Sequence, residues 1–370
     1  MYRGAKTFMS ERKFYHEINF VRSIAALSVV LVHVTASNYS LNDKQLHWFV
    51  LFLNQITRYG TPFFAVISGF LLYNQAIKKQ YNFKKFLSSR FTKVLIPFFI
   101  WSFIYLIVKI YSQGGASDFE GTKHFIYNFL FGKSWYHLYF IAVVVQFYLV
   151  FPLIQRFHSQ KQLFVLTIIA LYFNSFHIIM PLEVSNKLLY QIVNERAFIL
   201  NWIYYFFLGG LLVHIWPKII SWIKKHSDIV IVLGFMAIIF TIYEYTYVDR
   251  ILDSTKLTNL IHVPILFIMF TGLYFVIIKY QKLTSFFLWI GNRSMGIYLV
   301  HPLVIWYIRR NFTWLLEKSK YIPFTYLLIL TLTIVLVQLI YRLPLGQYVV
   351  IVASRNRRNN SSNIRELSMK

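Results

Sequence analysis

Residues 18–37 read INFVRSIAALSVVLVHVTAS, an apolar stretch long enough to cross a lipid bilayer as one helix. Two ionisable side chains interrupt it, Arg22 near one end and His33 well inside. Their spacing is about three helical turns, or roughly 16 Å of rise, so both lie on one face of the helix. An ionisable group at this depth is costly unless it faces protein or water, and the pair is therefore the first functional candidate.

The rest of the chain is also apolar. Of its 370 residues 57% are hydrophobic and 20% are aromatic, and the mean hydropathy is +0.53. One soluble core could not bury so much apolar surface. The pattern predicts an all-α, polytopic membrane protein with about ten transmembrane helices. The expected spans are 19–37, 59–76, 94–112, 136–155, 163–180, 197–216, 228–248, 258–278, 286–308 and 323–345.

The net charge is +25, and the position of the cations indicates what they do. They lie mostly in the two tails and in alternate short linkers, as the positive-inside rule expects, rather than on one soluble face that would bind nucleic acid. Both termini are therefore predicted to be cytoplasmic, and a multi-pass protein of the cell membrane is expected. The linker that holds Arg309, Arg310, Lys318 and Lys320 departs from this rule.

Three regions are expected along the chain. A basic cytoplasmic tail at 1–18 precedes a single ten-helix transmembrane domain at 19–345, and a basic, disordered cytoplasmic tail follows at 346–370. The chain contains no cysteine and no H-E-x-x-H motif, so neither disulfides nor a metal centre are expected.

His33 has two interpretations. As a functional group, its imidazole could accept a proton from a hydroxyl, because imidazole titrates near neutral pH. As a structural group, it would be a neutral histidine bonded to a carbonyl or a serine between helices. Arg22 on the same face favours the first interpretation, although an arginine at a helix end also commonly extends to lipid headgroups.

A second basic pair, Arg90 and Lys93, opens the third span in SSRFTKVLIP. Residues three apart share a helical face, so the two cations could bind the phosphates of a cytosolic cofactor. From the sequence alone, ordinary anchoring at the inner membrane surface is the slightly favoured interpretation.

Four further residues are possible supporting groups. His301 lies in the ninth span at about the depth of His33, next to Pro302, which should kink that helix. His137 opens the fourth span, where a place in the interfacial aromatic belt is the favoured interpretation. Ser68 could bond a neighbouring histidine, but close helix packing is favoured for its small-residue segment. Arg293 marks the inner boundary of the ninth span.

In order along the chain, R-x10-H, GTPFFAVISGFLLY, R-x-x-K, WYHLYF and GNRSMGIYLVHPLVI resemble the membrane-bound acyltransferase 3 family over residues 17–345. The pieces FGKSWYHLYF and NWIYYFFLGG also resemble the branch linked to poly-N-acetylglucosamine export or O-succinylation.

This resemblance implies an O-acyltransferase that moves an acyl group from cytosolic acyl-CoA to a hydroxyl of a surface polysaccharide or its lipid-linked precursor. Acetyl-CoA is the expected donor, with succinyl as the alternative acyl group. His33 would be the catalytic base, and Arg22, Arg90 and Lys93 would bind the donor. Lys93 stands where many members have arginine, and lysine lacks the bidentate geometry. The alternative function is export of a polysaccharide or lipid-linked sugar without acyl transfer. The expected partners are the donor, the glycan and membrane lipids, without nucleic acid.

Overall fold

The structure is a computed structural model that describes residues 14–45, 47–78, 82–113, 115, 117–248 and 253–353. Within these ranges every regular element is a helix and there is no strand, in agreement with the predicted all-α class. The α-helices are α1 (His16–Leu41), α2 (Trp48–Thr57), α3 (Gly60–Ile77), α4 (Phe83–Arg90), α5 (Ile96–Gln113), α6 (Thr122–Leu130), α7 (Tyr139–Ile154), α8 (Gln160–Ile179), α9 (Lys187–Val193), α10 (Ile203–Lys225), α11 (Ser227–Tyr243), α12 (Asn259–Ile277), α13 (Gln281–Asn311), α14 (Thr313–Glu317), α15 (Ile322–Arg342) and α16 (Gly346–Val349).

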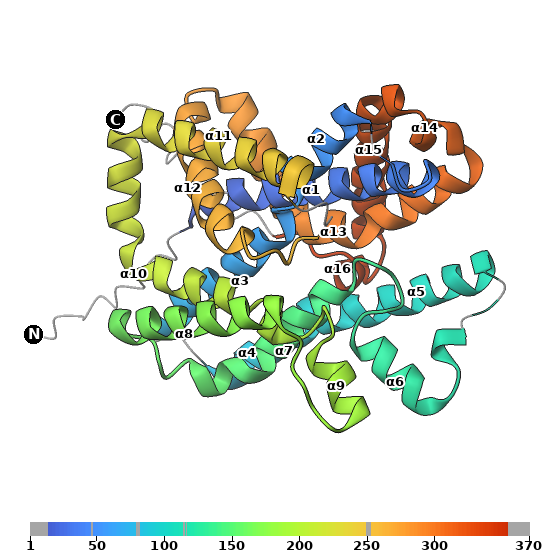
Figure 1. The fold of residues 1–370 in the computed structure, drawn as a ribbon, viewed down its shortest axis with the longest axis horizontal. Coiled ribbons are helices and arrows are strands. Elements are labelled where there is room, and N and C mark those ends of the chain that lie inside the picture. The colour runs from blue at the N-terminus through green and yellow to red at the C-terminus, as the bar shows by residue number, and fades with distance from the viewer. Residues whose placement is uncertain are drawn as a thin grey trace, which may run out of the picture.

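Helix α1 runs through the middle of the bundle, with α13 along its side (Figure 1). It also contacts α2, α3, α12, α14 and α15, so most of its surface is covered by protein. The hydroxyl groups on α1 bond carbonyls of their own helix: Ser23 bonds Phe20 O at 2.6 Å and Ser37 bonds His33 O at 2.9 Å. These bonds satisfy the polar groups of a helix that is otherwise apolar.

Helices α3 and α10 pack against each other with their backbones in close approach, and glycines make the contact. A Cβ atom on Gly69 would lie 2.0 Å from the carbonyl oxygen of Phe206, and one on Gly209 would lie 2.1 Å from that of Val66. Only glycine therefore permits this approach of the two backbones. The interpretation of the GTPFFAVISGF segment as a packing surface agrees with this geometry.

Seven helical segments of the described residues are long and apolar enough to cross a membrane, which supports a multi-pass membrane protein. They are His16–Leu41, Phe83–Ser112, Gln160–Ile179, Ile203–Lys225, Ser227–Val248, Asn259–Ile277 and Ser319–Arg342. The other three expected spans coincide with α3, α7 and α13. Helix α7 has only 16 residues, and α13 carries Arg293 and His301 in its interior. The total of ten spans and the cytoplasmic termini stay predictions.

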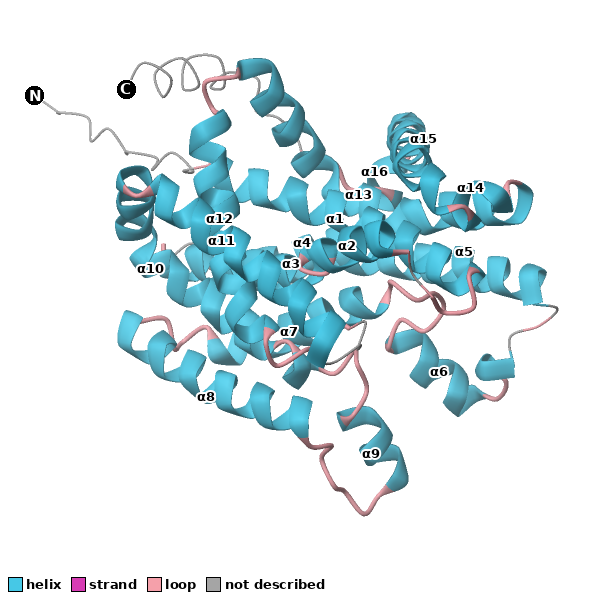
Figure 2. Cartoon of the chain, turned by 45° about the horizontal axis from the view of Figure 1, so that its top comes forward, coloured by secondary structure: helices cyan, strands magenta, loops and turns pink. Residues whose placement is uncertain are grey.

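Several short elements lie outside the expected spans, among them α2, α6 and α9, which Figure 2 shows between the long helices or beside them. The expected tail at 346–370 is ordered at its start: Val350 is fully buried, and the Trp101 indole donates to Val349 O at 3.0 Å. The prediction of disorder is therefore wrong for residues 346–353. Residues 1–13 and 354–370 of the two predicted tails lie outside the described residues.

Candidate functional site

Three histidines from distant parts of the sequence meet beside α1. The rings of His33 on α1 and His301 on α13 are stacked, with their centroids 5.3 Å apart and their planes at 24°. The ring of His137, which lies just before α7, is 5.5 Å from that of His301. We call His33, His137 and His301 the histidine cluster. The similar depth expected for His33 and His301 thus corresponds to a direct contact.

The three members of the histidine cluster differ in burial. His137 and His301 are fully buried, whereas His33 keeps part of its accessible surface. The Nδ1 of His301 lies 2.9 Å from Ile297 O, and it must be the donor because a carbonyl oxygen can only accept. In the neutral imidazole of His301, the lone pair is therefore on Nε2. That Nε2 has no hydrogen-bond partner among the described residues. No hydrogen bond within the described ranges involves the His33 ring, which leaves its nitrogens available to a substrate.

The full burial of His137 corrects the sequence interpretation. An interfacial belt residue would expose its ring to headgroups, but His137 instead packs edge-on against Tyr105, with ring centroids 5.1 Å apart. The Tyr298 hydroxyl donates to the His137 carbonyl oxygen, which ties the start of α7 to α13. The sequence WYHLYF could not reveal this, because a boundary aromatic cluster looks the same whether it faces lipid or protein.

Tyr105 of α5 fixes the segment of α13 that carries His301. Its hydroxyl donates to Leu299 O at 2.7 Å and accepts from Leu303 N at 3.1 Å. These two residues are one helical turn apart and flank Pro302, where a proline weakens the backbone ladder. The hydroxyl therefore supports the helix at the turn that holds the cluster.

Two cations predicted to bind a donor lie near one aromatic ring at the other end of the bundle, here called the inner end. The Arg90 guanidinium carbon lies 4.9 Å from the centroid of the Tyr148 ring on α7, and Arg22 interacts electrostatically with the same tyrosine. Arg90 is half-buried, and its Nε has no hydrogen-bond partner among the described residues. The end of α4 thus meets α7 at Tyr148, and Arg22 of α1 lies within electrostatic range of the same tyrosine.

Lys93 differs from the expectation that it shares a face with Arg90. It lies in a π-helical turn, Phe91–Leu95, and its side chain is exposed. A π-turn bonds residue i to i+5, so it rotates residues three apart further from one another than an α-helix does. The sequence spacing alone could not indicate this change of helix type.

The two remaining candidates make other contacts. Ser68 donates to Phe64 O within its own helix at 2.7 Å, and within the described ranges no hydrogen bond joins it to a histidine. The Arg293 guanidinium stacks on Trp289 at 3.9 Å, and its Nη2 donates to Gln338 Oε1 at 3.2 Å. Arg293 is thus engaged with α15, and in the part of the chain that the structure describes no hydrogen bond or ring contact connects it to Arg22 or Arg90.

Sequence reasoning missed two arginines near His33. Arg58, between α2 and α3, and Arg196, before α10, both interact electrostatically with the His33 ring. The available signal was their position: each is a cation at the end of a span where the positive-inside rule expects few.

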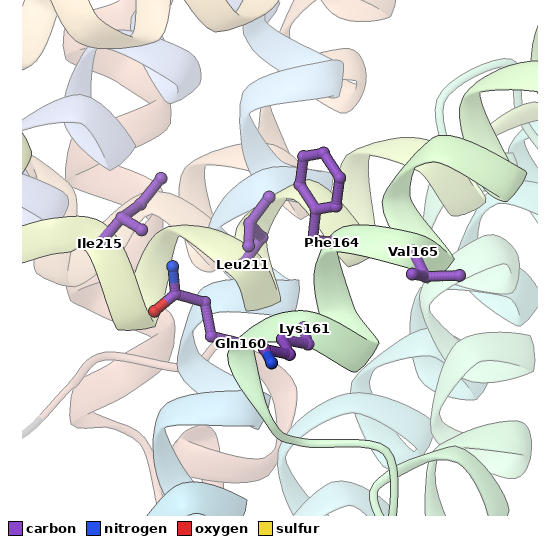
Figure 3. Close-up of a pocket in the computed structure, with 6 residues that line it drawn as sticks. All are labelled: Gln160, Lys161, Phe164, Val165, Leu211 and Ile215. Carbon is purple, nitrogen blue, oxygen red and sulfur yellow. The ribbon is translucent and has the colours of Figure 1, made fainter.

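A surface pocket lies apart from these groups, between the first turns of α8 and the middle of α10 (Figure 3). Its lining is mainly apolar, with Phe164 and Leu211 beside Gln160 and Lys161. None of the candidate site residues contributes to it. Within the described residues, no group of three histidine or carboxylate side chains has metal-binding geometry.

Comparisons with known proteins identify the family of this chain. A family model described as "Acyltransferase domain" matches residues 15–342. A probable poly-beta-1,6-N-acetyl-D-glucosamine export protein of Staphylococcus aureus (strain Mu50 / ATCC 700699) is 26% identical over 316 residues, which cover 80% of this chain and 83% of that protein. A protein of the same description from Staphylococcus epidermidis is 25% identical over 307 residues, covering 78% and 81% respectively. No solved structure matches the chain significantly.

Proposed function

The chain belongs to the acyltransferase family whose model spans residues 15–342, and we propose that it transfers an acyl group from cytosolic acyl-CoA to a hydroxyl of a surface polysaccharide or its lipid-linked precursor. One observation carries the proposal. His33, accessible and free of hydrogen bonds among the described residues, lies on the same helix as Arg22, which interacts electrostatically with Tyr148, and the Arg90 guanidinium stacks on the Tyr148 ring. One rigid helix would thereby join the proposed proton acceptor to the proposed anion-binding end.

The chemistry assigned to His33 is general base catalysis. Its ring nitrogen would take the proton of the acceptor hydroxyl while that oxygen attacks the thioester carbon. Collapse of the tetrahedral intermediate breaks the carbon–sulfur bond, and the departing CoA sulfur receives the proton back from His33. His301 would act as a positioning residue, because its stacked ring limits the orientations of the His33 ring.

The donor would bind along α1. Arg22 and Arg90 would hold the CoA phosphates at the inner end, since fixed guanidinium groups make strong bonds to phosphate oxygens. Lys93, exposed on its π-turn, would add a weaker electrostatic contribution. The pantetheine arm would then span the three turns of α1, roughly 16 Å, that separate Arg22 from His33. Acetyl is the proposed acyl group, with succinyl as the alternative.

The names of the relatives favour a second candidate, export of a polysaccharide without acyl transfer. Membranes that contain the protein are incubated with acyl-CoA labelled in its acyl group, and the extracted polysaccharide is analysed. Label that enters the polysaccharide only when the protein is present supports acyl transfer. Polysaccharide that crosses the membrane without label supports the exporter instead.

A further inference from the structure

The two arginines beside His33 are held in place by specific contacts. Arg58 Nε donates to Asn54 Oδ1 at 2.8 Å, and Asn54 Nδ2 donates to Thr35 Oγ1 at 2.8 Å. Thr35 lies two residues after His33 on α1, and Asn54 is fully buried. A chain of two hydrogen bonds therefore connects the guanidinium of Arg58 to the helical turn that carries His33.

Arg196 is held by a second set of contacts, with Asp253 and Tyr139. Its Nη2 lies 3.3 Å from Asp253 Oδ1, and its guanidinium carbon is 4.4 Å from the centre of the Tyr139 ring. Asp253 Oδ1 also accepts from the backbone N–H and the hydroxyl of Thr255, both at 2.9 Å. We call Arg58 and Arg196 the arginine pair.

Charge in this region is unbalanced. Asp253 is the one carboxylate that interacts electrostatically with both members of the arginine pair among the described residues. Within those residues no carboxylate lies within salt-bridge distance of Arg58. The nearby Glu244 faces Lys256 at 3.9 Å, so these two residues add no net charge. Among the described residues, the arginine pair therefore has one carboxylate for its two guanidinium groups.

These groups are also accessible. The Arg196 side chain keeps 42% of its accessible surface and Asp253 keeps 34%. Tyr136, whose ring centroid is 4.7 Å from that of His33, is 48% exposed. Two guanidinium groups that are already oriented bind a carboxylate or phosphate with little loss of side-chain freedom.

We propose that the arginine pair binds an anionic group of a substrate, a carboxylate or a phosphate, next to the hydroxyl that His33 would deprotonate. This inference rests on the proposed acyl transfer. Two substrates would supply an anionic group of this chemistry: an acceptor glycan that carries one, or an acyl group with a second carboxylate. A cationic, amine-bearing sugar would be disfavoured at this site by the two guanidinium groups.

The test measures binding to the purified full-length protein in detergent. Calorimetry compares glucuronate, N-acetylglucosamine and glucosamine as anionic, neutral and cationic sugar probes, and succinyl-CoA with acetyl-CoA as donors. We expect an anionic probe to bind at least tenfold more tightly than its neutral counterpart, and Arg58→Gln or Arg196→Gln to remove that preference. A preference for glucuronate over the other two sugars assigns the anion to the acceptor. A preference for succinyl-CoA over acetyl-CoA assigns it to the acyl group.

Control variants distinguish a loss of the predicted anion preference from misfolding of the protein and from loss of the proposed reaction. Arg310→Gln removes an exposed arginine that stacks on Tyr111 at 4.7 Å, and should leave the preference unchanged. Arg58→Lys keeps the charge and should restore part of the preference. His33→Ala should abolish transfer without changing the preference, because binding does not require the base. Equal binding of anionic and neutral probes, or an equal effect of Arg310→Gln, overturns the inference even if acyl transfer is demonstrated.

Discussion

Replacing Gly291 by alanine should disturb the site from a distance, through the contact between α1 and α13. A Cβ atom at this position would lie 2.3 Å from the carbonyl oxygen of Asn19 and 2.7 Å from its Oδ1. Asn19 cannot turn away without loss, because its Nδ2 donates to Leu288 O at 3.0 Å and to Asn292 Oδ1 at 3.1 Å. The two helices must therefore separate.

The size of the effect follows from these distances. An ordinary contact begins at 3.4 Å, so the backbone of α1 must move by about 1 Å from that of α13. Overpacking of this kind costs about 1–3 kcal/mol of stability. The same movement would separate His33 from His301, and a misplacement of about 1 Å at a reacting centre can reduce a rate by roughly a hundredfold.

The assay compares thermal unfolding and the rate of acyl transfer for Gly291→Ala with those for Gly296→Ala. The control lies on the same helix, but its added Cβ would meet the Val337 side chain at 2.9 Å rather than a backbone atom. A side chain can adjust, so we expect a small loss of stability and a nearly normal rate. Equal rates for the two variants would refute the claim that the contact between α1 and α13 sets the geometry of the site.

Three further predictions concern the inner cations, Asp253 and Tyr105. Arg90→Gln should weaken acyl-CoA binding about tenfold or more in calorimetry. Lys93→Gln should weaken it less, because Lys93 is exposed. Unchanged affinity for Arg90→Gln would assign Arg90 to membrane anchoring. Although burial alone would raise the pKa of Asp253, Arg196 and hydrogen bonds from Thr255 lower it below the usual value. The stabilising effect of this carboxylate is then complete above about pH 4 and is lost as the pH falls further, so the stability difference between wild type and Asp253→Asn should be constant from about pH 5 to 8 and shrink below about pH 4. Tyr105→Phe removes two hydrogen bonds from a fully buried hydroxyl and should cost about 1–3 kcal/mol of unfolding free energy; an unchanged melting temperature would contradict the bracing of α13.

The lengths of the apolar runs were sufficient to predict the helices, but not whether each helix packs against protein or faces lipid. Each expected span coincides with a helix, because about twenty apolar residues have few alternatives in a bilayer. The sequence could not show that α1 would be surrounded by protein, since a helix that faces lipid and one that faces apolar neighbours have similar compositions.

The site was predictable where one helix fixes the geometry and less so where several helices meet. The joint placement of Arg22 and His33 follows from helical spacing alone. The burial of His137 depends on how α5, α7 and α13 pack, and the position of Lys93 depends on a π-turn. The arginine pair is brought to His33 by a short helix and a loop, which carry no periodic signal.

The role of His33 is tested most directly by the transfer of labelled acyl groups to polysaccharide in membranes that contain His33→Ala, with His214→Ala as the matched control. His214 lies on α10 and bonds His158 O at 2.7 Å, and among the residues that the structure describes no hydrogen bond or ring contact joins it to the histidine cluster. Both variants should be present in the membrane at wild-type levels with similar melting temperatures. We predict normal labelling with His214→Ala and none above background with His33→Ala. Labelling at the wild-type rate by folded His33→Ala would contradict the assignment of His33 as the base.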